Sequence, residues 1–291
     1  RITVVDSNDG STPVDFPIEA SLAGLPKWEL EDITPASLAS PLVLPTNPTV
    51  MQLLERVLRL VSVGSKAFHV NMVDHSVGGR VVQSQRCGPF GLPVADAAVS
   101  RLSFLDYMGE AGALGDQPLK VLLGGPAGIR MSTAEGLTNL AGVLVESFEG
   151  IKAQGNVMWP GRTDGELARL YKGLDEGVRI FMCELGICED GGKDSGSMAA
   201  KDVLGKLVKS LPTFVSTLYA KVPDVRKVVT PDIKFPGKSA LMLIDIGGGK
   251  LRLGGSALGQ VYDQIGEDCP DIDDPAYLRN AFEGMQSLVS E

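Results

Sequence analysis

Two sets of oxygen-bearing side chains in this sequence are suited to binding a hard metal ion. The first is Asp96, and the second is the pair Glu135 and Asn139. In a helix, residues four positions apart lie on one face, one turn above the other. Carboxylate and carboxamide oxygens suit Mg²⁺, which keeps several waters and bridges to phosphate oxygens. The three residues therefore form a candidate site for a magnesium-bound nucleotide.

Spacing alone is weak support for this site, because Glu and Asn four residues apart are typical of a solvated helix face. The surrounding sequence adds five motifs in a fixed order. They are Asp74-His75-Ser76-Val77-Gly78-Gly79, Gln85-Arg86-Cys87-Gly88-Pro89, Pro93-Val94-Ala95-Asp96, Ala134-Glu135-Gly136-Leu137-Thr138-Asn139 and Gly192-Lys193-Asp194-Ser195-Gly196-Ser197-Met198. This succession resembles phosphoribosylformylglycinamidine synthase, and specifically the second of its two aminoimidazole-ribonucleotide-synthetase-like repeats.

The resemblance implies a ligand set. Asp96, Glu135 and Asn139 match the magnesium ligands of this repeat, and Ala95 matches a backbone contact to ATP or ADP. It also places a loop formed by Lys193, Asp194 and Ser195 near phosphates, although a tight polar turn is the plain alternative. The family completes the metal site with an aspartate and a serine that lie downstream of Glu291, so the site is expected to be incomplete in this sequence.

One motif departs from the family. His75 stands where an arginine is more usual, so a permanently charged group is replaced by one that titrates near neutral pH. Any phosphate contact made by that arginine is therefore in doubt. His69 lies in an alternating apolar segment, which favours a packed core histidine over a catalytic one.

The resemblance also implies an activity for the whole polypeptide. Such proteins are ATP-dependent carbon–nitrogen ligases with a glutamine amidotransferase domain, and they act in purine biosynthesis. This repeat would be a structural magnesium-nucleotide unit that is inactive alone, with the remaining domains of the polypeptide as its partners. We identify no catalytic residues. The alternative is a catalytically silent scaffold domain that keeps the fold and binds no nucleotide.

Composition limits the class of partner and compartment. The net charge of −9 disfavours nucleic acid and anionic membranes as partners, because both require a basic surface. No apolar run is long enough to cross a membrane. The four cysteines lack a zinc-site spacing, so we expect buried free thiols and a reducing compartment, the cytoplasm.

We expect three regions along the chain. Residues 1–44 are the tail of a preceding domain and a linker, residues 45–236 are the synthetase-like nucleotide-binding domain, and residues 237–291 begin the carboxyl-terminal synthetase-like domain. The fold class is α/β (α+β), with an antiparallel-rich sheet backed by helices. We expect the exposed sheet to favour self-association. Predicted helices cover 47–60, 132–148, 166–185 and 256–265, and predicted strands cover 2–5, 68–70, 81–82, 94–102, 156–159, 213–220 and 240–246.

A glycine-rich stretch near residue 247 offers a competing interpretation. Gly247-Gly248-Gly249-Lys250 resembles the end of a P-loop, but Leu251 stands where that motif requires Ser or Thr. With the apolar run before it, the stretch also resembles the phosphate loop of sugar-kinase and actin-like ATPases. We treat the kinase-like function as a minor alternative.

Overall fold

The computed structural model describes residues 1–22, 29–33, 39–73, 75 and 78–291. The chain divides into two compact units, residues 1–32 and 33–291. In the first unit β1 (Ile2–Val4) pairs antiparallel with β2 (Val14–Phe16), and α1 (Ile18–Leu22) follows. The strand predicted at the amino end is therefore present. The domain boundaries at residues 44 and 236 remain a prediction.

The second unit is built on a six-stranded sheet. Its strands, in spatial order, are β3 (Val81–Gln83), β4 (Ala98–Arg101), β5 (Gly109–Asp116), β10 (Thr213–Val222), β6 (Lys152–Met158) and β7 (Cys188–Ser195). All neighbours are antiparallel except β6 and β7, which are parallel. A separate hairpin joins β8 (Ala199–Lys201) to β9 (Leu207–Lys209). The predicted antiparallel-rich sheet is confirmed.

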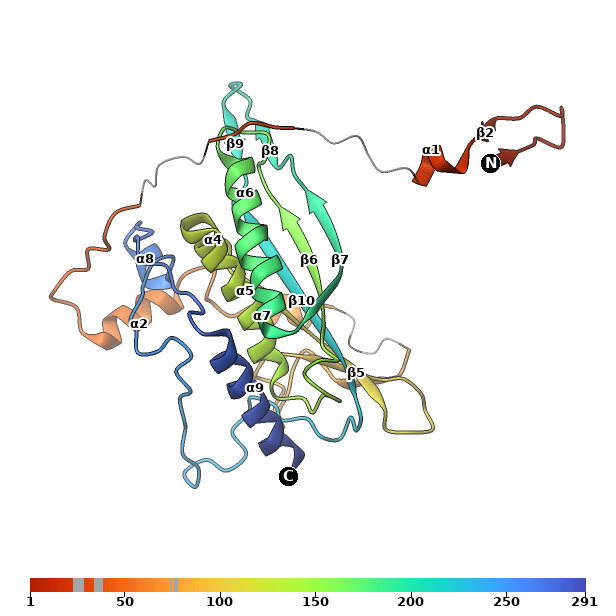
Figure 1. Ribbon diagram of the computed structural model, residues 1–291. Helices are drawn as coiled ribbons and strands as arrows, with labels where there is room; N and C mark the ends of the chain where they lie inside the picture. Colours follow the sequence, from red (N-terminus) through yellow and green to blue (C-terminus); the bar gives the residue numbers. More distant parts are fainter. Residues whose placement is uncertain (23–28, 34–38, 74, 76–77) are drawn as a thin grey trace. The chain divides into compact units, whose positions relative to one another are not determined.

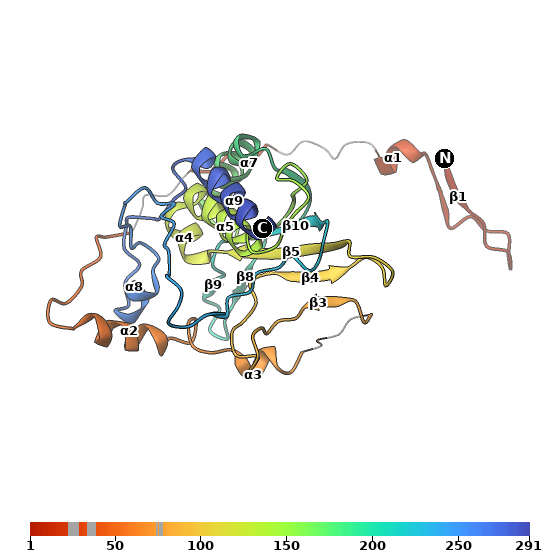
Figure 2. The ribbon, with the colours of Figure 1, turned by 90° about the horizontal axis from the view of Figure 1, so that it is seen from below.

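Helices cover one side of this sheet, as Figure 2 shows. The central helix α5 (Pro126–Leu140) packs across β5 and β10, beside α4 (Pro118–Gly124). A long helical segment lies next to it and is formed by α6 (Glu166–Leu174), a π-helical stretch (Asp175–Ile180) and α7 (Phe181–Leu185). The remaining helices are α2 (Val50–Leu58), α3 (Ala67–Val70), α8 (Ala257–Val261) and α9 (Pro275–Ser290).

Small residues allow α5 and β5 to approach closely. A Cβ atom added to Gly115 would lie 1.8 Å from the carbonyl oxygen of Ser132 and 2.7 Å from the amide nitrogen of Gly136. A Cβ on Gly128 would lie 2.1 Å from the backbone nitrogen of Val121 in α4. Because no other residue fits at these two contacts, glycine fixes the spacing of the two helices and the strand.

The carboxyl-terminal helix α9 packs against α7 and α5 and adds to the main core. Its Leu278 and Phe282 are 1% and 4% exposed. The segment before it is held by Arg130 of α5, whose guanidinium donates two hydrogen bonds of 2.7 Å to the carboxylate of Asp271. Residues 271–290 therefore belong to the same packed unit as the sheet.

Several predicted elements differ in the structure. The helix predicted from residue 47 begins at Val50, because Thr49 and Gln52 form a reciprocal capping box at its start. Residues 68–70 lie in the short helix α3 rather than in a strand. The helix predicted over 132–148 runs from Pro126 to Leu140, and residues 143 and 144 instead bond to residues 227 and 228.

The strand predicted over 240–246 is absent. Leu241, Met242 and Leu243 are 90%, 87% and 90% exposed, and the structure assigns residues 240–246 no strand. A strand requires a neighbouring strand to satisfy its backbone groups. Residues 240–246 pair with no strand within the described ranges, so an apolar β-prone sequence alone does not form one.

Candidate functional site

Glu135 and Asn139 both reach the end of β5 from α5. The Oε2 atom of Glu135 accepts a hydrogen bond of 2.7 Å from the amide of Asp116. The Nδ2 atom of Asn139 donates one of 2.9 Å to the carbonyl of Leu114. Tertiary contacts with β5 therefore fix the two side chains that the helical spacing had placed on one face.

Asp96 lies in a bend two residues before β4. Ala98 of β4 pairs with Gly112 of β5, so an extension of that register by two residues would set Asp96 across from Leu114. Partial burial raises the pKa of Asp96 above its ordinary value. The neighbouring Ala95 donates its amide to the carbonyl of Gln85. The strand pairing ends at Ala98, and no hydrogen bond or ion pair within the described residues joins Asp96 to Glu135 or Asn139, so a role for Asp96 beside them stays a prediction.

Two further residues, Asp116 and Gln117, lie at this strand end, although no sequence motif pointed to them. The Nε2 atom of Gln117 donates a hydrogen bond of 2.8 Å to the same Oε2 atom of Glu135. Burial, and then the charge of Glu135, raise the pKa of Asp116. Burial lowers the pKa of Lys120, while the charges of Cys269 and Glu135 oppose that shift. The available sequence signal was a polar pair directly before Pro118, the residue that begins α4.

The donor set fits a hard cation better than a softer metal. Glu135 Oε1 and Asn139 Oδ1 accept no hydrogen bond from the part of the chain that the structure describes. Two oxygen acceptors one helical turn apart therefore remain available to a ligand. Across the described ranges, no group of three His, Cys, Asp or Glu residues is arranged to hold a metal ion. A magnesium ion here would depend on the amide of Asn139 and on phosphate or water oxygens as well.

Lys193, Asp194 and Ser195 lie in strand β7 rather than in a loop. The ammonium of Lys193 donates to the hydroxyl of Ser195. Strand pairing connects Asp116 to Val215, Val215 to Asn156, and Asn156 to Lys193. The end of β5, where Glu135 binds, and the Lys193 group in β7 therefore share one cross-strand row. Three strand spacings separate them by about 14 Å. Both groups therefore lie at the same end of the sheet.

The glycine-rich stretch near residue 247 does not form a phosphate loop. The carboxylate of Asp245 accepts hydrogen bonds from the amides of Gly247 and Gly249, at 2.8 and 2.7 Å. Lys250 pairs with Asp273. The amides and the cation that would bind phosphate are thus already used within the protein, which removes the basis for the kinase-like alternative.

The histidines and cysteines differ in part from expectation. His69 is exposed and stacks beside Phe68, because its segment is helical, so it is not a core residue. His75 has its Nδ1 atom 3.0 Å from the hydroxyl of Ser84, and its neighbour Asp74 lies outside the described residues. All four cysteines are free, but Cys183 and Cys188 are exposed rather than buried.

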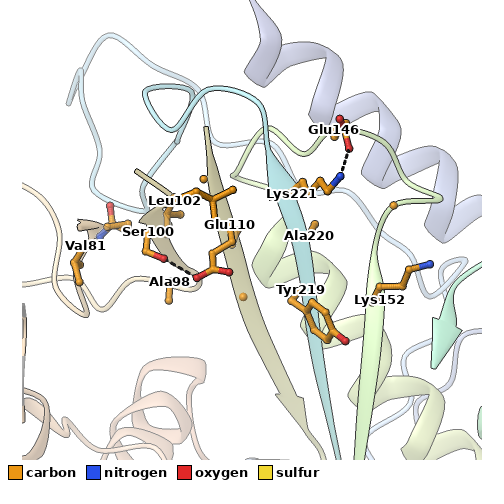
Figure 3. Close-up of a pocket in the computed structure, with 16 residues that line it drawn as sticks. Val81, Ala98, Ser100, Leu102, Glu110, Glu146, Lys152, Tyr219, Ala220 and Lys221 are labelled. Carbon is orange, nitrogen blue, oxygen red and sulfur yellow. Dashed lines mark hydrogen bonds and ion pairs between the residues drawn. The ribbon is translucent and has the colours of Figure 1, made fainter. Parts of the chain in front are cut away.

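The open side of the sheet forms a broad hollow of about 760 Å³. Figure 3 shows Ala98, Glu110 and Tyr219 projecting from three adjacent strands toward it. Ser100 donates a hydrogen bond to Glu110 at its rim, and Lys221 forms an ion pair with Glu146 at 3.8 Å.

No helix within the described ranges is long and apolar enough to cross a membrane.

Comparison with known proteins supports the family suggested by the motifs. A family model described as the FGAR-AT PurM_N-like domain matches residues 65–220, which is more than half of the chain. The chain belongs to that family. The match spans α3 to most of β10 and includes every predicted site residue.

Two curated relatives match nearly the whole chain. The probable phosphoribosylformylglycinamidine synthase, chloroplastic/mitochondrial, of Arabidopsis thaliana is 42% identical over 305 residues, covering 100% of this chain and 21% of that protein. The Homo sapiens phosphoribosylformylglycinamidine synthase is 43% identical over 281 residues, covering 96% and 21%. The chain therefore spans about a fifth of the length of these relatives.

Two solved structures are more distant. The structure of PurLQS from Thermotoga maritima is 19% identical, covers 76% of this chain and 32% of that chain, and has a TM-score of 0.48. PurL of the same organism complexed with ADP is 19% identical, covers 79% and 33%, and has a TM-score of 0.44. The fold described above rests on the strands and helices of this chain rather than on these matches.

Proposed function

We propose that this chain is a magnesium-nucleotide-binding unit within a phosphoribosylformylglycinamidine synthase. The carrying observation is that Glu135 and Asn139 converge on the end of β5 with one free oxygen each. Asp96 would supply the third ligand, from the bend before β4. ATP or ADP is the proposed nucleotide, with the backbone of Ala95 as a contact.

Different residues would bind the metal ion and the nucleotide phosphates. Asp96, Glu135 and Asn139 would hold Mg²⁺, which when bound supplies positive charge to nucleotide phosphates. Lys193 would supply a second positive charge at the same end of the sheet, with Asp194 and Ser195 beside it. These residues bind and orient. No catalytic step is assigned to this chain.

For the whole polypeptide we propose the reaction that the relatives' names indicate. Formylglycinamide ribonucleotide, ATP and glutamine would be converted to formylglycinamidine ribonucleotide, ADP, phosphate and glutamate, as a ligase reaction of purine biosynthesis. The remaining domains of the polypeptide would be the partners of this chain. We place the protein in the cytoplasm, in keeping with four free cysteines; localisation of a fluorescent fusion would test this, because the Arabidopsis relative's name specifies organelles.

Calorimetric titration of the chain with ADP, with and without Mg²⁺, tests the binding function. Asp96→Asn should weaken magnesium-dependent binding by about tenfold or more, because it removes charge and keeps volume. Asp164→Asn, at an exposed aspartate before α6, is the matched control and should bind like the parent chain. A parent chain that binds no ADP would favour the silent scaffold, for which the exchange of arginine for His75 is the supporting feature. Binding that ignores Mg²⁺, or that Asp96→Asn leaves intact, would contradict the metal assignment.

A further inference from the structure

Gln117 is placed to control a residue of the proposed metal site without contacting the metal itself. Its amide nitrogen and the backbone amide of Asp116 both donate to a single oxygen of Glu135, at 2.8 and 2.7 Å. A carboxylate oxygen can accept two such bonds, and the second oxygen is then left in a fixed direction. The other oxygen of Glu135 accepts nothing from the described part of the chain.

The position of Gln117 is fixed by its backbone. The backbone amide of Gln117 donates to the hydroxyl of Ser132 at 3.2 Å. That hydroxyl in turn donates to the carbonyl of Gly128, one turn earlier in α5. Ser132 is fully buried and Gln117 is half-buried. Gln117 is also the residue before α4, yet its side chain makes no capping bond to that helix. The side-chain amide of Gln117 therefore binds Glu135 and does not cap α4.

We propose that Gln117 is a positioning residue that orients Glu135 for Mg²⁺. The inference rests on the proposed nucleotide-binding function. Residues that hydrogen-bond to metal ligands hold them in the required direction, and losing one typically weakens metal affinity by about 10- to 100-fold. The Oε2 atom of Glu135 is held by donors at the end of β5, and its Oε1 atom is left for the metal. Among the described residues, Gln117 supplies the only side-chain donor to Glu135.

Ion size provides a readout that a purely structural role would not change. Mg²⁺ demands near-ideal octahedral geometry, whereas Ca²⁺ accepts flexible geometry and variable ligand number. A loosened Glu135 should therefore impair binding supported by Mg²⁺ more than binding supported by Ca²⁺. Gln117→Glu keeps the shape of the side chain but replaces its donor with a negative charge facing Glu135, so it should be more damaging than Gln117→Ala.

The experiment measures the Kd of the chain for ADP in Mg²⁺ and in Ca²⁺, together with thermal unfolding without metal. Gln117→Ala should raise the Kd in Mg²⁺ by about tenfold, with a smaller change in Ca²⁺ and little change in Tm. Gln117→Glu should raise the Kd in Mg²⁺ further than Gln117→Ala does. Gln154→Ala, at an exposed glutamine in β6, is the matched control and should leave both values unchanged.

Three results would overturn the inference. The first is a Gln117→Glu variant that binds like the parent chain in both metals. The second is an equal loss in Mg²⁺ and Ca²⁺ that follows a fall in Tm, which would show a packing role. The third is a Gln117→Ala variant that binds normally while Asp96→Asn does not, which leaves the proposed function standing. If the parent chain binds no ADP in Mg²⁺, the proposed function and this inference fail together.

Discussion

Burial controls the ionisation of Glu189 in β7. Its Oε1 atom lies 2.1 Å from the position that a Cβ on Gly155 of β6 would occupy. This burial raises the pKa of the Glu189 carboxyl above its ordinary 4.5, and a hydrogen bond from the amide of Gly155 opposes the shift only in part. The folded chain therefore favours the protonated form of Glu189 relative to the unfolded chain.

A pH-dependent effect on stability follows from Glu189. Because the pKa of Glu189 is higher in the folded chain, this carboxyl contributes stability that is fully present below its unfolded-state pKa near 4.5. That stability is lost as the pH rises through the folded-state pKa. Glu189→Gln, which cannot ionise, should therefore unfold at higher urea concentration than the parent chain at pH 7, and this difference should shrink to nothing below about pH 4. Glu184→Gln, at an exposed glutamate in α7, is the control. A difference that is equal at both pH values would contradict the burial argument.

At the scale of elements, the contact between β5 and α5 determines where the site residues meet. Gly115 faces α5, and there is no room there for a methyl group. Gly112 of the same strand faces the open side, where an added Cβ would find only an ordinary contact of 3.8 Å, with the carbonyl of Leu218. The two glycines thus differ in packing while sharing one strand.

This difference predicts opposite outcomes for one chemical change. Gly115→Ala should lower the free energy of unfolding by about 1–3 kcal/mol or more, because the strand must move away from α5. Gly112→Ala should change it by less than about 1 kcal/mol. Urea unfolding followed by circular dichroism measures both. Equal effects at the two positions would show that the close approach of β5 and α5 is not required for stability.

At the scale of the second unit, the described helices and the hollow lie on different faces of the sheet. Helices pack on one face, and the hollow of Figure 3 occupies the other. The exposed fractions of Leu102 and Leu114 are 47% and 57%. An exposed apolar sheet face with open edges favours association with another protein surface. In the purified chain, a second copy is the available partner.

We therefore expect the chain to self-associate as its concentration rises. Ala98→Glu, which places a charge on the open face opposite Gly112, should shift sedimentation toward the monomer without lowering Tm. Val203→Glu, at the exposed tip of the hairpin between β8 and β9, should leave association unchanged. A strict monomer at high concentration, or dissociation caused by Val203→Glu alone, would show that the sheet face is not the contact.

The sequence alone determined the features that depend on local pattern. The helical stretch from Glu166 to Leu185 and the strand at 213–222 were predicted closely, because their apolar residues recur at helical and strand periods. The family motifs proposed Glu135 and Asn139 as ligands, which stays a prediction, and the helical period placed them on one face of α5. Periodicity and short motifs were enough for these expectations.

Only the tertiary structure determined β5 and its contacts. The strand is made of Gly, Ala, Leu and two acidic residues, which have weak strand propensity, and it forms because α5 and its two neighbouring strands fit against it. The converse holds for residues 240–246, which have strong strand propensity and form no strand without a partner. Gln117 and Asp116 enter the site for the same reason, since they contact Glu135 across 18 and 19 positions of sequence once β5 lies against α5.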